Sequence, residues 1–416
     1  MQKLWKRIVH AAQYGKVLCK WLLIGLMVGL IGGVVGTMFH LGVEWVTELR
    51  LNNDWILWLL PACGVLITAL YHVCKLEGTD TNNIIESVHF GEKVPLLLVP
   101  LIYIATMLTH LCGGSAGREG AALQIGGGIG HRVGRVLHLG EKEMPLATLS
   151  GMAALFSALF GTPLAAVMFA MEVISVGVLY YAALVPCMTA SFVGYLVSTR
   201  LGTTPVRFLL RMPQVEVWPM VQVGILAIGC AVVSIIFCQG LHSIEHLAEK
   251  FLKNAYVRAA VGGGLIIALT FLVGTDYNGT GMDVIARAIG EEHIFWAAWL
   301  LKILFTAITI GCGFKGGEVV PSFFVGATFG AVAAPLIGLP GGFGAAIGMV
   351  AVFCGAVNCP VASCVLGVEI FGASGMMYFA MACAISYLLS GYRGLYSSQT
   401  IMYSKLRAEY INVHTK

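Results

Sequence analysis

The stretch Gly113-Gly114-Ser115-Ala116-Gly117-Arg118-Glu119-Gly120-Ala121 places an arginine and a glutamate between two apolar segments. The residues from 94 to 117 contain no Asp, Glu, Lys or Arg. An ionisable side chain at membrane depth is costly, so Arg118 and Glu119 are functional candidates; a solvated pair in an exposed loop is the alternative. The glycines favour the first interpretation, since glycine permits positive φ and a close approach of the backbone to a ligand. We expect a helix to begin at Glu119–Gly120 and to aim its free N–H groups and its positive dipole end at this point.

A second copy of this stretch follows 200 residues later, as Gly311-Cys312-Gly313-Phe314-Lys315-Gly316-Gly317-Glu318-Val319-Val320-Pro321. The identities 200 residues apart are Gly113/Gly313, Gly117/Gly317, Gly126/Gly326 and Gly130/Gly330, and those 197 residues apart are Gly151/Gly348, Met152/Met349, Ala154/Ala351, Phe156/Phe353, Pro163/Pro360, Ala165/Ala362 and Glu172/Glu369. We therefore predict two membrane repeats, 21–205 and 216–400, joined by a connector at 206–215. An amphipathic N-terminal segment (1–20) and a short C-terminal tail (401–416) flank them.

Composition places the chain among membrane proteins. Of its 416 residues, 58% are hydrophobic and 11% are charged, whereas an ordinary soluble domain has roughly 25% charged residues. This excludes a soluble enzyme, and we expect no enzymatic activity. Charge-free runs of 24, 28, 27, 28 and 50 residues occupy 94–117, 144–171, 173–199, 217–244 and 319–368. A bilayer core needs about 20 apolar residues per helix, and a lipid-exposed backbone must satisfy its own hydrogen bonds, so we predict an all-α polytopic membrane protein.

The longest charge-free run, 319–368, is too long for one crossing. Four prolines interrupt it: Pro321, Pro335, Pro340 and Pro360. We expect short, tilted and partly re-entrant helices there. Duplicated membrane proteins often have repeats of opposite topology, whose broken helices end at a substrate site near the bilayer midplane. Glu172 and Glu369, which follow uncharged helices at matched positions, are expected to mark helix ends at the membrane surface.

Basic residues dominate the N-terminal flank. Those that precede the first acidic residue, Glu44, are Lys3, Lys6, Arg7, Lys16 and Lys20. Such a flank predicts a cytoplasmic N-terminus. The apolar stretch behind it runs on to Val43 and further apolar segments follow, so we expect an uncleaved first segment rather than a signal peptide.

No motif indicates a cofactor, a metal ion or a nucleic acid. The run Gly126–Gly130 lacks the βαβ surroundings and the acidic residue of a dinucleotide loop. His242 and His246 have metal-compatible i, i+4 spacing but lack the His-Glu-x-x-His order. The net charge of +4 does not imply nucleic acid. We therefore expect none of these three partners.

The two matched stretches predict an anion site. Each places a carboxylate at the start of a long uncharged helix, Glu119 in the first and Glu318 in the second. With inverted repeats, two helix N-termini face one another, and their backbone N–H groups hold an anion that is still able to leave. An ionised Glu119 competes for that site and protonation releases it, which couples anion movement to proton movement.

In these residues the chain resembles the CLC family of chloride channels and proton-coupled anion exchangers. Gly117-Arg118-Glu119-Gly120-Ala121 resembles the family's Gly-Arg-Glu-Gly-Pro motif, and Gly317-Glu318-Val319-Val320-Pro321 resembles its Gly-x-Phe-x-Pro motif. Tyr396 stands where the family places its central tyrosine. The resemblance covers essentially the whole chain and implies the CLC-type fold, with two inverted-topology repeats of tilted, broken helices. It also implies a homodimer with one anion pathway per subunit and Glu119 as the external gate.

Three positions depart from the chloride-transporting members. The segment Gly78–Asn83 has no recognisable serine or proline of the family's Gly-Ser-Gly-Ile-Pro motif, and Val173 stands in place of the inner proton glutamate. Glu318 replaces an apolar residue. Gly-Gly-Glu-Val-x-Pro resembles the bacterial fluoride/proton antiporter branch, which usually has a threonine where this sequence has Val320.

We therefore predict a fluoride/proton antiporter, a multi-pass protein of the bacterial inner membrane that exports fluoride in exchange for protons. Its expected partners are fluoride or chloride, protons, membrane lipid and a second copy of the chain. Glu119 is expected to be the external gate and proton-transfer group, and Glu318 the internal group that couples protons to the anion. The expected anion-binding residues are Gly117, Arg118, Gly120, Thr81, Asn82, Asn83, Val319, Val320 and Tyr396. Asp80 is expected to cap the following helix.

Other functions stay open from the sequence alone. Within the family, the alternatives are a chloride/proton exchanger and a passive chloride channel. Outside it, a cation/proton antiporter would use Glu119 and Glu318 as cation ligands.

Overall fold

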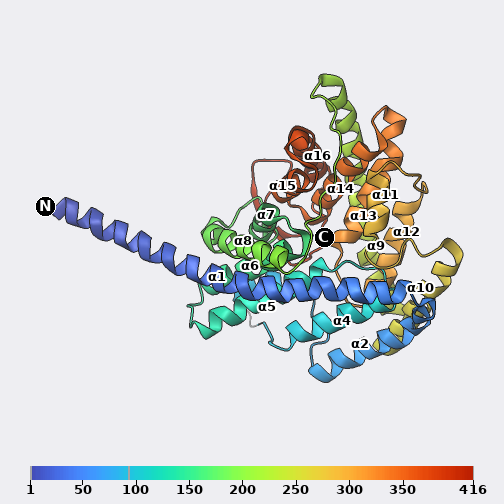
Figure 1. Ribbon diagram of the computed structural model, residues 1–416, viewed down its shortest axis with the longest axis horizontal. Coiled ribbons are helices and arrows are strands. Elements are labelled where there is room, and N and C mark those ends of the chain that lie inside the picture. The colour runs from blue at the N-terminus through green and yellow to red at the C-terminus, as the bar shows by residue number, and fades with distance from the viewer. Residues whose placement is uncertain (1, 92–93, 416) are drawn as a thin grey trace.

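The computed structural model describes residues 2–91 and 94–415, most of which lie in helices joined by turns and loops (Figure 1). Met1 and Lys416, at the ends of the expected N-terminal segment and tail, lie outside the described residues. So do the side chains of Lys3, Lys6 and Arg7, on which the expected orientation of the N-terminus partly depends.

Within the described residues, helices α1–α8 precede residue 205 and α9–α16 follow it. The first set is α1 (Gln2–Leu51), α2 (Leu60–Cys74), α3 (Thr81–Phe90), α4 (Leu98–Leu111), α5 (Glu119–Val136), α6 (Met144–Phe160), α7 (Pro163–Glu172) and α8 (Leu184–Arg200). The second set is α9 (Val217–Phe251), α10 (Ala255–Val273), α11 (Met282–Ile289), α12 (Ala298–Gly311), α13 (Val319–Ala333), α14 (Gly341–Val357), α15 (Pro360–Phe371) and α16 (Met376–Leu389). Short 3-10 helices are η1 (Asp54–Leu59), η2 (Tyr181–Ala183), η3 (Ala334–Ile337) and η4 (Ala373–Gly375). The two sets therefore match helix by helix.

Local sequence signals explain the matched helix ends. Pro163 and Pro360 are the first residues of α7 and α15, the position at which the missing N–H of proline costs nothing. Gly161 and Asn358 follow α6 and α14 in the left-handed conformation, which ends a helix. The charge-free run 319–368 consequently forms α13, the 3-10 helix η3, α14 and the first part of α15, as its prolines predict.

The two repeats meet at a point of local two-fold symmetry. Gly117 N–H donates to the carbonyl of Gly317 over 2.6 Å, and Gly317 N–H donates to the carbonyl of Gly117 over 2.8 Å. The bridge is antiparallel, so equivalent segments run in opposite directions where they touch. Such a reciprocal contact is the mark of a two-fold relation and agrees with the expected inverted topology.

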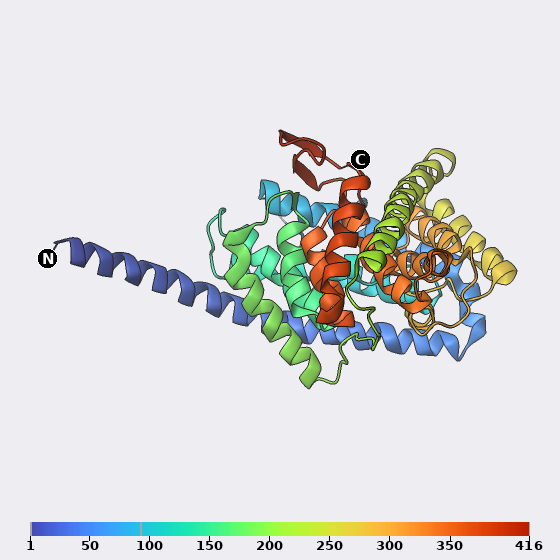
Figure 2. The same cartoon turned by 90° about the horizontal axis from the view of Figure 1, so that it is seen from above.

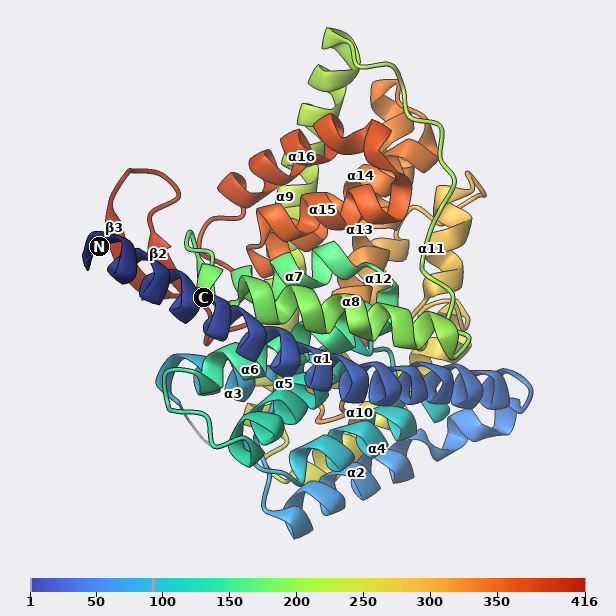
Figure 3. The same ribbon diagram turned by 60° about the vertical axis from the view of Figure 1, so that its left-hand side comes forward.

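Glycines allow the two most extensively packed helix pairs to approach closely. A Cβ on Gly126 of α5 would overlap the backbone of Gly151 in α6, and a Cβ on Gly326 of α13 would overlap that of Gly348 in α14. Small residues at helix interfaces have this role in membrane proteins. The same pair of contacts thus lies in the core of each repeat; Figure 3 shows α5 beside α6 and α13 beside α14.

Glu172 and Glu369 tie the repeats together a second time. The Glu172 carboxylate accepts hydrogen bonds from Val361 and Ala362 at the start of α15, over 3.2 and 2.8 Å. The Glu369 carboxylate accepts from Leu164 and Ala165 at the start of α7, over 3.0 and 2.8 Å. Both residues lie at helix ends, and their position at the membrane surface stays a prediction, but Glu172 is only 6% exposed and does not face solvent. The reason is that each carboxylate caps the N-terminus of a helix in the other repeat.

Six helical stretches among the described residues are long and apolar enough to cross a membrane. They are Ala12–Leu51, Asp54–Cys74, Tyr181–Arg200, Val217–Phe251, Ala255–Val273 and Val319–Ile337. α1 has 50 residues, or about 75 Å at 1.5 Å per residue, far more than a bilayer core of about 30 Å requires. Its first turns accordingly extend away from the other helices (Figure 2).

A small sheet was not predicted. The strand β1 (Ser175–Val176) pairs in parallel with β2 (Thr400–Tyr403), which pairs antiparallel with β3 (Tyr410–His414). Strand β1 follows α7, whereas β2 and β3 belong to the C-terminal end of the chain. The sheet is a minor element of a helical fold.

Candidate functional site

The two motif loops approach each other because their glycines leave room. A Cβ on Gly317 would lie 2.8 Å from the backbone nitrogen of Glu119. The loops are also held in matching ways: Ser115 N–H donates to Thr309 Oγ1 over 3.0 Å, and Lys315 N–H donates to Thr109 Oγ1 over 3.3 Å. Helices α5 and α13 therefore begin beside one another with their N-termini converging, as the sequence predicts.

The Glu119 carboxylate lies where these two helix N-termini converge. Its Oε2 accepts a hydrogen bond from the Arg118 N–H over 3.0 Å and another from the Val320 N–H over 3.2 Å. The side chain is fully buried, and its Oε1 has no hydrogen-bond partner among the described residues. A carboxylate oxygen thus accepts from backbone N–H groups of both repeats, an arrangement suited to any small anion.

Arg118 lies on the first-repeat side of this carboxylate. It is 7% exposed and interacts electrostatically with Glu119 and Glu44. The loop is further fixed by His110 of α4, whose Nε2 lies 3.2 Å from the Gly117 carbonyl oxygen. The positive charge beside Glu119 is therefore part of a buried, ordered loop rather than a solvated pair.

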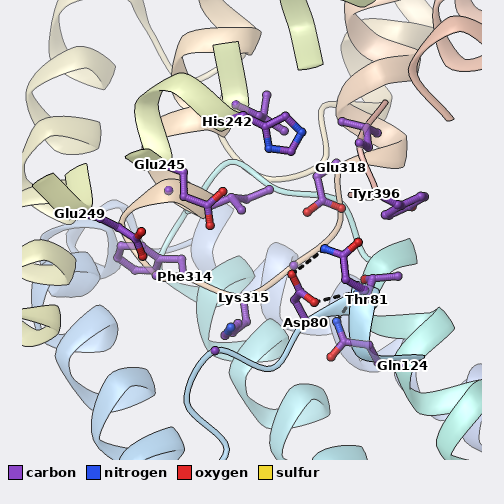
Figure 4. A pocket seen from close by; sticks show the side chains of 18 of the residues that line it. Asp80, Thr81, Gln124, His242, Glu245, Glu249, Phe314, Lys315, Glu318 and Tyr396 are labelled. Carbon is purple, nitrogen blue, oxygen red and sulfur yellow. Dashed lines mark hydrogen bonds between the residues drawn. The ribbon is translucent and has the colours of Figure 1, made fainter. Parts of the chain in front are cut away.

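A second group of functional candidates lines a cavity of about 210 Å³ (Figure 4). Of the predicted site residues, the cavity brings together Thr81, Asn82, Glu318 and Tyr396. It does not include Gly117, Arg118, Glu119, Gly120, Asn83, Val319 or Val320. The predicted residues therefore form two groups, one around the Glu119 carboxylate and one around the cavity.

Glu318 and Tyr396 both present unpaired polar atoms. Glu318 is the N-cap residue of α13, and its Oε2 has no hydrogen-bond partner among the described residues. The same holds for the hydroxyl of Tyr396, a residue only 2% exposed. Buried polar atoms usually find a partner, so these two are candidates for contact with a substrate.

Asp80 caps α3, as expected. Its carboxylate accepts hydrogen bonds from the Asn82 N–H over 2.8 Å and from the Asn82 Nδ2 over 2.9 Å. It also accepts a hydrogen bond from the Asn83 N–H, while the Asn83 side chain accepts one from the Asp80 N–H, which completes a capping box. The backbone N–H groups of Asn82 and Asn83 are therefore already engaged. Their role in anion binding stays a prediction, and it would require an anion to replace Asp80 as acceptor.

Several residues that line the cavity were not among the predicted site residues. They are His242 and Glu245 of α9, Gln124 of α5, and Lys315 of the second motif loop. Gln124 Nε2 donates to Thr81 Oγ1 over 3.3 Å. The sequence could have indicated Lys315, because it is a lone cation at the position where the first repeat has Ser115. Nothing in the sequence places α9 beside this loop.

A metal site has no support in the described part of the chain. Within residues 2–91 and 94–415, no three His, Cys, Asp or Glu side chains gather in a way that could hold a metal ion.

Converging helix N-termini, broken helices and a buried carboxylate between two inverted repeats are features of a membrane transporter, with a candidate anion site where the repeats meet. The family model described as voltage gated chloride channel matches residues 63–391. The chain therefore belongs to this family, the CLC family, and is a multi-pass membrane protein.

Two relatives and one solved structure show which members of the family the chain is similar to. The chain is 35% identical over 398 residues to a chloride/fluoride channel protein of Pseudomonas syringae pv. tomato, covering 93% of this chain and 88% of that one. It is 26% identical to an H(+)/Cl(-) exchange transporter, ClcA, of Vibrio cholerae, covering 84% and 81%. The crystal structure of a CLC-type fluoride/proton antiporter superposes with a TM-score of 0.89 at 32% identity, covering 92% of this chain and 98% of that one.

Proposed function

We propose that this protein is a CLC-type fluoride/proton antiporter that exports fluoride in exchange for protons. The observation that carries the proposal is the Glu119 carboxylate, which accepts hydrogen bonds from the Arg118 and Val320 N–H groups. A group that accepts those bonds when ionised excludes an anion from them. The names of the relatives described above, a chloride/fluoride channel protein and a fluoride/proton antiporter, support the same class of substrate.

Glu119 is the external gate in this mechanism. When it is protonated, it loses the negative charge that the converging N–H groups favour, and it leaves them to fluoride. When fluoride moves on, the deprotonated carboxylate returns to the same N–H groups. Proton binding and anion binding thus alternate at one place, and this alternation couples the two movements.

Glu318 and Tyr396 serve the inner half of the pathway. Fluoride is a small, strong hydrogen-bond acceptor, so removing its water requires close donors. The Tyr396 hydroxyl and a protonated Glu318 supply two donors that line one cavity. Glu318 is also the acidic residue that replaces the missing inner proton glutamate, since Val173 is apolar. Chloride accepts hydrogen bonds more weakly and gains less from these donors.

We infer the assembly from the family and the orientation from the basic N-terminal flank. We infer a homodimer with one pathway per subunit, embedded in the lipid of a bacterial inner membrane with its N-terminus in the cytoplasm. α1 crosses outward and α2 returns, which puts the loop 75–80 and the cavity beside it on the cytoplasmic side. The converging N-termini and Glu119 then lie between the cavity and the outer surface. The two repeats, 21–205 and 216–400, supply one loop each.

Reconstituted protein tests the proposal. Liposomes loaded with equal fluoride and chloride would be diluted into halide-free buffer, and halide release and proton uptake would be recorded together. We expect preferential fluoride release accompanied by proton uptake. Chloride release at an equal or faster rate would instead favour a chloride/proton exchanger, and release without proton movement would favour a passive channel. Cation flux without halide flux would favour a cation/proton antiporter.

A further inference from the structure

The inner cavity is lined by more carboxylates than cations, which opposes the entry of an anion. The carboxylates are Asp80, Glu245, Glu249 and Glu318, and the cations are Lys315 and Arg258. His242 lines the same cavity. Ionised carboxylates repel fluoride through Coulomb forces that are stronger in a partly enclosed site than in water. A fluoride exporter therefore needs a positive charge at this mouth.

Of the two cations that line the cavity, Arg258 forms an ion pair with a carboxylate and Lys315 does not. Arg258 Nη1 lies 3.7 Å from Glu249 Oε1 and forms an ion pair with it. Lys315, among the described residues, has no carboxylate oxygen within the 4.0 Å of an ion pair. Its ammonium group donates to the Thr79 carbonyl over 3.1 Å and lies 4.6 Å from the ring centroid of Tyr71. An ammonium group has three donors, and the Thr79 carbonyl accepts from one of them.

The fold holds this ammonium group in place. Lys315 is half-buried, its backbone N–H is bound to Thr109, and it stands three residues before Glu318 in the same loop. Figure 4 shows Lys315 on the wall of the cavity, with Glu318 and Tyr396 further along the same space. Charged groups with which it interacts electrostatically are Asp80, Glu245, Glu318 and Arg258. Tyr396, whose buried hydroxyl has no hydrogen-bond partner among the described residues, lines the same cavity.

We propose that Lys315 forms an inner entry site for a small anion, which collects fluoride from the cytoplasmic side before it reaches Tyr396 and Glu318. This inference rests on the proposed function and adds the residue that recognises the substrate as it enters. The ammonium group acts by charge and by hydrogen bonding, and no proton needs to leave it. The equivalent residue of the other repeat, Ser115, has the same backbone hydrogen bond but no charge, so the site belongs to the inner side alone.

The test measures fluoride uptake into inverted membrane vesicles, in which the cytoplasmic side faces the bath, with an acid vesicle interior as the driving force. We expect Lys315→Met to raise the half-saturating fluoride concentration by roughly three- to tenfold, as the loss of one nearby unit charge implies. The maximal rate and the fluoride-to-proton ratio should stay near wild type. Added salt should lessen the difference, because it screens the ammonium charge. Lys315→Arg should keep the low half-saturating concentration.

Two controls make the result specific. The double variant Arg258→Met/Glu249→Gln removes the other lining cation together with its partner carboxylate, so the net charge of the cavity stays the same and the half-saturating concentration should change much less. Right-side-out vesicles, in which fluoride reaches the opposite face, should show no shift with Lys315→Met. An unchanged half-saturating concentration in inverted vesicles, equal shifts from both faces, or failure of Lys315→Arg to preserve it would each overturn the inference. A wild-type protein that moves no protons with fluoride would instead contradict the proposed function.

Discussion

The two motif loops, 113–118 and 313–318, have closely matched backbones but opposite electrical surroundings. Each loop is held by a threonine of the other repeat, and the two share the bridge between Gly117 and Gly317. Around the first loop, His110 interacts electrostatically with Arg50, Arg118 and Lys302. Around the second, Glu318 interacts with Asp80, Glu245 and Glu119. The duplication therefore preserved the backbone while the charges diverged.

A shift of one residue separates the two glutamates. Glu119 is the first residue of α5, whereas Glu318 precedes the first residue of α13. Glu119 consequently reaches the N-terminus of the other repeat's helix, and Glu318 lines the cavity instead. The comparison teaches that one repeated scaffold provides both an anion gate and a separate inner carboxylate. Each prediction below challenges this division between the loops.

The largest effect is expected from Glu119→Gln. An amide neither titrates nor competes as an anion, so fluoride-driven proton uptake should fall by at least roughly a hundredfold. Proton uptake and fluoride release would be measured in the same liposomes. Glu48→Gln, a change at an exposed glutamate of α1, is the control. If Glu119→Gln pumped protons at the wild-type rate, Glu119 of the first loop would not be the gate.

Glu318→Gln should have the next largest effect. The cavity then lacks the titratable group that stands in for the absent inner glutamate, and coupled turnover should fall by about tenfold. Glu249→Gln, at a carboxylate that lines the same cavity but pairs with Arg258, should leave turnover nearly unchanged. If the Glu318 variant exchanges fluoride for protons at the wild-type rate and ratio, the second loop contributes no proton chemistry.

A methyl group between the loops should weaken the fold. Gly317→Ala brings a Cβ within 2.8 Å of the Glu119 backbone nitrogen, and overpacking of this kind costs about 1–3 kcal/mol. Thermal unfolding in detergent should therefore begin at a lower temperature. Gly264→Ala, in α10 with no atom close to the added Cβ, should unfold like the wild type. Equal unfolding of both variants would mean that the close approach of the loops is unnecessary.

The smallest effect on stability is expected from changes to the two reciprocal helix caps, Glu172 and Glu369. Glu172→Gln and Glu369→Gln each replace one accepting oxygen by a donor at a helix N-terminus, which costs about 1 kcal/mol of stability. The cost should be greater for the buried Glu172 than for the half-buried Glu369. Unfolding temperatures of the two variants measure this difference. A larger loss with Glu369→Gln would contradict the burial argument.

Much of the fold was predictable because it depends on local patterns. Charge-free runs of sufficient length form membrane helices, and prolines begin α7 and α15. The starts of α5 and α13 follow glycine-rich loops, and Asp80 caps α3 through neighbours two and three residues away. The internal duplication is visible as identical residues at a fixed spacing. Each of these features is determined by residues that lie close together in the chain, together with the need of a lipid-exposed backbone to satisfy its own hydrogen bonds.

Only the tertiary structure decided which distant groups meet. The contact between Glu119 and the Val320 N–H spans 201 residues, and that between Glu172 and Ala362 spans 190. The placement of α9 beside the second motif loop, and the pairing of β1 with β2, have no local signature. These contacts form because close glycine contacts and the reciprocal caps bring the two repeats together about one axis. Which side chains meet at the interface then depends on that packing and not on neighbours in the sequence. The sequence alone determined a duplicated membrane protein with two glutamate-bearing loops; packing placed one glutamate on the helix N-termini and the other in the cavity.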